Sequence, residues 1–502
     1  MVSSFCWGCL SRLQPATPRA LQTPRLIPGV ATAAPFHTSA PREAPPLKKK
    51  SKSQDGGPKF RTSKSARIKR KKPIDKGRPP AIGERRAMRK RIVLSNTNAL
   101  EVPGLQDLTA ESIADTRLRE KVVGLPVAML DQLRAVEAFK PTQGWNMFRR
   151  PGMLMRKESL ELGRLIEEIT DKGERKVEKR VVTGVRGAGK SLHLLQAMSM
   201  AFLKNWVVIT MPEAQDLTIG STQYEPLANS DPTLYVQKQA TSALLSRMAT
   251  ANEAVLSELH LSQRHPTFPT KLQPDITLHQ LATLGAQDRD LAWPAFKAIW
   301  AELNATEAAA DLEGAKEFKA RPPTLVTVDN LAHWMQNSKY RTADFDLIHA
   351  HDLALVNHFL SLLSPPPGAD ATTPTLNNGL LLYSTSGSNS PTIYGFTMAL
   401  KQLQARNAGI SESSPDFPQP DPYLKPDQRV LDLFNKKDIT FQELKGLTKG
   451  ESRGLMEYFA QSGILREKVN DAWVGEKWSL AGGGVVGELE RLGKRLRAQA
   501  LV

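Results

Sequence analysis

Cysteine is almost absent from this 502-residue chain: its two cysteines, Cys6 and Cys9, both lie among the first nine residues. A disulfide framework or a cysteine-based zinc site is therefore excluded for the rest of the chain. Long apolar runs are missing too, because no stretch approaches the about 18 residues that a membrane-spanning helix needs. The sequence thus predicts a protein without a membrane span, long enough for two or three domains with separate cores.

Acidic residues are missing from residues 1–42, which carry Arg12, Arg19, Arg25 and Arg42 among many Ser, Thr, Ala and Pro. A basic, acid-free start without a continuous apolar segment is typical of a mitochondrial transit peptide and not of a secretory signal. We therefore predict that residues 1–42 are a transit peptide and that the protein works in the mitochondrial matrix. The alternative is an extension with no targeting role.

Positive charge is concentrated in one part of the chain. The formal net charge is +17, yet residues 48–91 contain nineteen Lys and Arg against three acids, and the chain after residue 91 carries a net −2. A charged segment rich in Pro, Gly and Ser cannot bury enough apolar surface to fold alone. Residues 43–100 are predicted to be a disordered basic arm, which fits RNA, an anionic membrane surface or an importin as its partner.

Apolar segments of strand length alternate with helical ones in the central part of the chain. Three of them predict strands: Trp206–Met211, Thr324–Val328 and Gly379–Tyr383; Lys179–Thr183 is predicted as a short strand before a glycine-rich turn. Continuous apolar strands separated by helices, such as Ser191–Leu203, indicate a parallel, doubly wound α/β sheet. Residues 176–400 are predicted to form this domain, with a largely helical insertion at 213–323.

The flanking segments complete the predicted organisation. Helical periodicity marks residues 101–175, and Pro, Ser and Asp mark a linker at 401–428. Residues 429–502 suggest three short helices followed by two strands, which is the order of a winged-helix-like domain. The helices are predicted at Leu431–Phe434, Thr440–Leu444 and Gly454–Ser462, and the strands at Gly463–Leu465 and Ala472–Leu480.

One motif carries chemistry. A segment between the first predicted strand and its helix fits G-x-x-x-x-G-K-[ST], the phosphate-binding loop of P-loop nucleotide-binding proteins. Its residues are Gly184, Val185, Arg186, Gly187, Ala188, Gly189, Lys190 and Ser191. Glycines let backbone N–H groups surround a phosphate, while the lysine reaches the β- and γ-phosphates and the Ser191 hydroxyl ligates Mg²⁺.

Two further positions belong to the predicted site. A P-loop protein holds its metal with an acid at the end of a neighbouring strand, and Asp329 follows the strand Thr324–Val328. A helix N-cap is the alternative role for this aspartate. Ser384, after the strand Gly379–Tyr383, stands where a polar group would sense the γ-phosphate, with a plain turn as the alternative.

The residue after Asp329 argues against turnover. ATPases with an additional strand in the sheet usually place a glutamate there to activate the attacking water, whereas this chain has Asn330, which cannot accept a proton at neutral pH. We therefore predict no catalytic residue and binding without efficient hydrolysis. Asn435–Asp438 matches the guanine-recognition pattern N-K-x-D, but it follows a helical segment far beyond the sheet, and we interpret it as a chance match.

These residues resemble the death-associated protein 3 family of mitochondrial small-subunit ribosomal proteins, most closely its fungal members. The resemblance rests on segments from about residue 100 to the end: Trp145–Pro151, Gly184–Ser191, Trp206–Ala214, Leu325–Asn330 and Lys477–Glu490. It implies a body related to AAA+ and STAND ATPases within the small subunit of the mitochondrial ribosome, in contact with rRNA and ribosomal proteins.

The same resemblance implies binding of GTP or GDP. It assigns Gly184, Gly189, Lys190 and Ser191 to the phosphate loop and Asp329 to the metal. The residues themselves leave guanine and adenine open, so GTP, GDP and ATP, each with Mg²⁺, remain candidate ligands. The alternative function is an active P-loop ATPase or GTPase that acts as a remodelling or signalling switch.

Overall fold

A computed structural model describes residues 92–499, apart from 172–174, 229, 267, 270–271, 274, 308–317, 366–373 and 437. The predicted transit peptide and almost all of the predicted basic arm lie outside the described residues. Within the described part, no helix is both long and apolar enough to cross a membrane.

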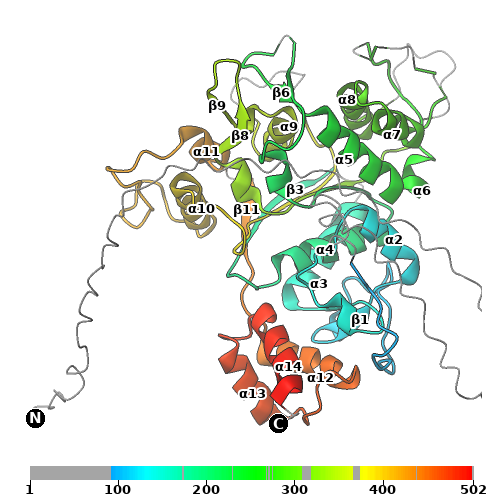
Figure 1. Ribbon diagram of the computed structural model, residues 1–502, viewed down its shortest axis with the longest axis vertical. Coiled ribbons are helices and arrows are strands. Elements are labelled where there is room, and N and C mark those ends of the chain that lie inside the picture. The colour runs from blue at the N-terminus through cyan, green and yellow to red at the C-terminus, as the bar shows by residue number, and fades with distance from the viewer. Residues whose placement is uncertain are drawn as a thin grey trace, which may run out of the picture. The chain divides into compact units, whose positions relative to one another are not determined.

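A five-stranded parallel sheet forms the centre of the described chain (Figure 1). Its order is β11–β3–β10–β7–β4. The strands are β3 (Val177–Thr183), β4 (Val207–Met211), β7 (Thr324–Val328), β10 (Gly379–Ser384) and β11 (Ile439–Glu443). The four predicted strands are confirmed, and so is the α/β fold with a parallel sheet.

Two separate cores form because successive strand side chains point to opposite faces of the sheet. On one face, Val181, Ile209 and Val326 pack in a core built largely by α5 (Lys238–Ala251), α7 (Leu278–Gln287), α8 (Ala292–Leu303), α9 (Ala354–Leu363), α10 (Tyr394–Asn407) and α11 (Gln428–Leu433). On the other face, Val182 and Val208 pack with α2 (Val127–Ala135), α3 (Lys157–Asp171) and α4 (Lys190–Leu203). Burial on both faces explains why β4, β7 and β10 are largely apolar.

The predicted helical insertion is present as α5, α7 and α8, with the short α6 (Glu253–Leu256) between them. Among the described residues, three small antiparallel pairs accompany the main sheet. They are β1 (Val122–Gly124) with β2 (Gly152–Leu154), β5 (Glu225–Pro226) with β6 (Tyr235–Val236), and β8 (Asn337–Arg341) with β9 (Leu347–His349). The first pair lies inside the region predicted as helical, because Val122 and Val123 find strand partners in Met153 and Leu154.

The winged-helix prediction is wrong. Thr440–Leu444, predicted as a helix, largely coincides with the edge strand β11, whose Ile439 and Phe441 pair with β3. Ala472–Leu480, predicted as a strand, lies in helix α13 (Asp471–Leu480), because Asn470 caps it by accepting a hydrogen bond from the Trp473 N–H.

The boundaries at residues 400 and 429 are wrong as well, since α10 continues to Asn407 and β11 belongs to the central sheet. The C-terminal unit begins after β11 and consists, in the described residues, of α12 (Lys449–Gln461), α13 and α14 (Val486–Gln499), which contact one another (Figure 1). It shares a small apolar core with Phe148 and Leu154 of the N-terminal region.

Candidate nucleotide-binding site

The loop Gly184–Ser191 joins β3 to α4 at the carboxyl edge of the sheet. Gly184 has φ +140°, and a Cβ there would lie 2.4 Å from the Leu444 carbonyl oxygen; Gly189 has φ +97°. Only glycine adopts such angles without strain, so both fixed glycines of the motif are required by the backbone. Val185 and Arg186 are exposed and Ala188 is buried.

The two functional side chains of the loop point inward. Lys190 is buried, and its ammonium donates to the carbonyl oxygens of Gly184 (2.7 Å) and Val185 (3.0 Å). Burial lowers the pKa of Lys190, and the charge of Asp329 opposes that shift. Because the first N–H groups of a helix lack partners within it, the start of α4 adds donors and a positive dipole end that suit an anion.

Asp329 connects the loop to the next two strands. Its Oδ2 accepts a hydrogen bond from the Ser191 hydroxyl at 2.8 Å, and its Oδ1 accepts one from the Ser384 hydroxyl at 2.7 Å. The N-cap alternative for Asp329 is not borne out, because Asn330 occupies that position before the 3₁₀-helix Leu331–Trp334. A hydroxyl and a carboxylate are oxygen ligands of the kind that Mg²⁺ prefers, so Ser191 and Asp329 fit the predicted metal role.

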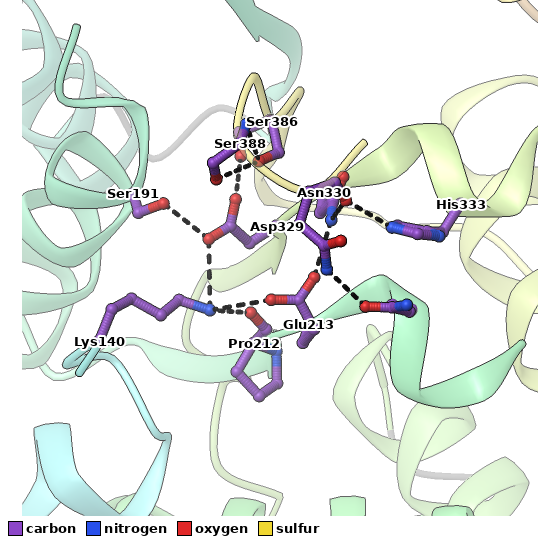
Figure 2. A network of polar contacts seen from close by, with 12 residues as sticks. Lys140, Ser191, Pro212, Glu213, Asp329, Asn330, His333, Ser386 and Ser388 are labelled. Atoms are coloured by element: carbon purple, nitrogen blue, oxygen red, sulfur yellow. Dashed lines mark hydrogen bonds and ion pairs between the residues drawn. The ribbon is translucent and has the colours of Figure 1, made fainter. Parts of the chain in front are cut away.

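Sequence reasoning missed two charged residues that complete this corner, drawn in Figure 2. The Lys140 ammonium lies 3.3 Å from Asp329 Oδ2 and 4.0 Å from Glu213 Oε2, and it donates to the Pro212 carbonyl oxygen. Glu213 lies two residues beyond the end of β4. Lys140 belongs to no motif, so no signal in the sequence marked it, whereas Glu213 stood only within a segment quoted for the family resemblance.

Asn330 adopts a left-handed backbone with φ 70° and is buried. Its amide donates to Glu213 Oε1 at 2.8 Å and to the Asn389 carbonyl oxygen at 2.9 Å. Burial raises the pKa of Glu213, although the hydrogen bond from Asn330 and the charge of Lys140 act in the opposite direction. The site therefore has a carboxylate near the position where a water-activating glutamate is expected, but an amide and an ammonium both engage it.

Segments from both ends of the described chain hold the loop from outside. The Gly487 N–H, at the start of α14, donates to the Gly187 carbonyl oxygen at 2.9 Å. The Arg156 guanidinium donates to the carbonyl oxygens of Ala188 (3.1 Å) and Lys445 (2.8 Å). These hydrogen bonds to the Gly187 and Ala188 carbonyl oxygens hold the backbone of the loop in place.

Two cavities adjoin this arrangement. An apolar cavity of about 120 Å³ reaches Gly189 of the loop and is lined by Trp145, Phe148, Leu192 and Val486 among others. A larger one, about 870 Å³, borders Lys140, Glu213 and Asn389. Of the segment that matches N-K-x-D, Asp438 pairs with Lys179 at 2.7 Å in the amino-terminal half of β3, whereas the loop follows the carboxyl end of that strand.

Comparison with known proteins gives a consistent picture. Residues 153–492 match the family described as mitochondrial ribosomal death-associated protein 3. The small ribosomal subunit protein mS29 of Neurospora crassa is 43% identical over 85% of this chain and 85% of its own length. The protein of the same name from Schizosaccharomyces pombe is 22% identical over 70% of this chain and 67% of its own length.

Among solved structures, the Aeropyrum pernix ORC1 protein in complex with DNA matches 70% of this chain and 61% of its own, with 13% identity and a TM-score of 0.29. That score is too low to support an argument about the fold, which rests on the sheet described above. The family match and the Neurospora relative each span more than half of the sequence. The chain belongs to the mitochondrial ribosomal death-associated protein 3 family.

Proposed function

We propose that this chain is a structural component of the small subunit of the mitochondrial ribosome that binds a purine nucleotide with little or no hydrolysis. Family membership and relatives named small ribosomal subunit protein mS29 support the ribosomal role. The proposal of nucleotide binding rests on one observation. The Ser191 hydroxyl of the glycine-rich loop donates to the carboxylate of Asp329, which follows a separate strand, at 2.8 Å at the carboxyl edge of the sheet. Ligands of open α/β sheets bind at that edge.

Each part of a nucleotide has a group to receive it. The loop N–H groups and Lys190 hold the phosphates, and Ser191 and Asp329 supply oxygen ligands for Mg²⁺, which neutralises phosphate charge when bound. The apolar cavity beside Gly189, lined by Trp145 and Leu192, receives the purine ring. GTP, GDP and ATP all meet these requirements.

The basic segment 48–91 provides the contact with rRNA in this proposal. Its nineteen Lys and Arg suit a phosphate backbone, which supplies most of the sequence-independent affinity for nucleic acid. This segment lies outside the described residues, so the proposal for it rests on charge and on the ribosomal family.

One observation favours the alternative of an active switch. Glu213 lies beside Asp329 and is a carboxylate that could accept a proton from water in place of residue 330. Asn330 donates to one oxygen of this carboxyl group at 2.8 Å, and the Lys140 ammonium lies 4.0 Å from the other, so protein groups already engage both oxygens. We therefore favour binding over turnover.

A turnover assay separates the two functions. With GTP or ATP and Mg²⁺, the full chain should hydrolyse well below the about 10⁻² s⁻¹ of a GTPase switch that carries its own catalytic arginine. Glu213→Gln should leave this low rate unchanged, because the carboxylate takes no part. Fast hydrolysis that Glu213→Gln abolishes would instead establish the active switch.

A further inference from the structure

Lys140 lies in the segment between α2 and β2, where hydrogen bonds and ring packing hold its backbone. Its backbone N–H donates to the Gln143 side-chain oxygen at 2.9 Å, and the same oxygen accepts the Trp145 indole N–H at 2.6 Å. Phe139 and Trp145, both buried, pack edge to face with ring centroids 5.2 Å apart. These contacts hold the backbone at Lys140 in place and so fix the position from which its side chain extends.

The ammonium of Lys140 occupies an acidic corner. It lies 3.3 Å from Asp329 Oδ2, 4.0 Å from Glu213 Oε2, and within hydrogen-bond reach of the Pro212 carbonyl oxygen (Figure 2). The Lys140 side chain is only 20% exposed and that of Asp329 only 9%. Charges that are partly removed from water interact more strongly than surface pairs, which are usually worth little.

A metal ion and this ammonium compete for the same oxygen. Asp329 Oδ2 is the atom that the Ser191 hydroxyl contacts, and Mg²⁺ held by Ser191 and Asp329 would bind there. A divalent ion near a fixed ammonium loses part of its attraction through like-charge repulsion. The phosphates of a nucleotide, in contrast, gain a second cation besides Lys190.

We propose that Lys140 is a built-in cation of the phosphate site, which neutralises Asp329 and Glu213 and makes nucleotide affinity nearly independent of Mg²⁺. This inference rests on the proposed nucleotide binding and specifies its metal requirement. Lys140 acts here as a binding residue from outside the glycine-rich loop. It takes over, for binding, the charge neutralisation that a divalent ion otherwise supplies.

The test compares GDP affinity with excess MgCl₂ and with EDTA, using the full chain. For the wild-type protein we expect the two dissociation constants to agree within about threefold, because the ammonium already offsets the carboxylates. In Lys140→Met, two uncompensated carboxylates face the phosphates, and EDTA should weaken binding about tenfold or more, equivalent to about 1.4 kcal/mol. Lys140→Arg, which keeps the charge, should restore the wild-type ratio.

A matched control is Lys238→Met, which removes a lysine paired with Asp290 (2.7 Å) and Glu225 (2.9 Å) at the start of α5. It should leave the EDTA ratio unchanged, and thermal melting checks that every variant is folded. A merely structural role for Lys140 predicts weaker binding by the same factor with and without Mg²⁺. That result, or a steep Mg²⁺ dependence in the wild type that Lys140→Met leaves unaltered, would overturn the inference.

Binding of MnCl₂ without nucleotide distinguishes this inference from the proposed function. If no form of the protein binds GDP, nucleotide binding fails, but the competition at Asp329 can still be measured. Lys140→Met should then bind Mn²⁺ more tightly than the wild type, by about tenfold for a lost like-charge contact. Equal Mn²⁺ affinities would reject the role of Lys140 whatever the outcome with GDP.

Discussion

Replacing Lys190 and Ser191 together by alanine is expected to weaken GDP, GTP and ATP binding at least about 100-fold, or close to 3 kcal/mol. The double variant removes the ammonium that faces the phosphates and the hydroxyl that contacts Asp329 at 2.8 Å. Charge-assisted hydrogen bonds to phosphate are among the strongest in proteins, which accounts for the size of the effect. Isothermal titration of the full chain with each nucleotide measures it.

The matched control for this loss is Lys179→Ala; Lys179 lies on β3, the strand that leads into the loop, away from its carboxyl end and paired with Asp438 at 2.7 Å. That variant should bind nucleotide as the wild type does. Unchanged thermal melting of the double variant establishes that the domain still folds, and the variant keeps Gly184 and Gly189, which the loop backbone requires. Wild-type affinity in a folded double variant would remove the basis of the nucleotide site.

The second large effect concerns stability. Glu302, at the end of α8, is completely buried and accepts hydrogen bonds from the Ser262 N–H (2.9 Å), the Ser262 hydroxyl (2.6 Å) and Arg321 (2.7 Å). Burial raises its pKa, but the hydrogen bonds from His265 and Ser262 and the charge of Arg321 lower it overall. Glu302 is therefore a carboxylate that joins segments before and after α8.

Glu302→Ala leaves the Arg321 guanidinium, whose side chain is 4% exposed, buried without its partner. Breaking such a pair from one side costs about 3–5 kcal/mol of unfolding free energy. Urea unfolding monitored by circular dichroism should register this loss. Glu258→Ala, which removes an exposed pair with Lys319, should leave the unfolding curve nearly unchanged. A similarly small effect of Glu302→Ala would contradict the role given to this cluster.

The central strands and the glycine-rich turn between β3 and α4 could be predicted because their signals are local. Strands buried on both faces are largely apolar, as in Val207–Met211 and Thr324–Val328. Gly184 and Gly189 stand at positions where the backbone requires glycine. Asp329 could be placed at the site because the carboxyl ends of parallel strands lie along one edge of the sheet.

The C-terminal elements could not be predicted because their signals are weak or shared. Ile439–Glu443 is only half buried at the sheet edge, so its five residues carry no long apolar run. Asp471–Leu480 contains two tryptophans, which favour strands, yet the Asn470 cap and the contact of the Trp478 indole N–H with the Leu447 carbonyl oxygen (2.7 Å) belong to a helix. In both segments, tertiary contacts determine the secondary structure.

Lys140 and the Glu213–Asn330 pair are the parts of the site that only the structure supplies. Lys140 lies 189 residues before Asp329 in the sequence, and nothing in its neighbourhood resembles a phosphate motif. The sequence identified Asn330 as an amide where a glutamate is expected. It did not indicate that this amide contacts the Glu213 carboxylate, which lies beyond the end of the neighbouring strand β4.

The most direct measurement is the mass of the small molecule released when the purified full chain is denatured. Backbone amides of the Gly184–Ser191 loop and the Lys190 ammonium should retain a purine nucleotide through purification, and mass spectrometry should find a guanosine or adenosine phosphate in near-equimolar amount. Protein that releases no nucleotide, and that binds neither GDP nor ATP when they are added back, would contradict the account.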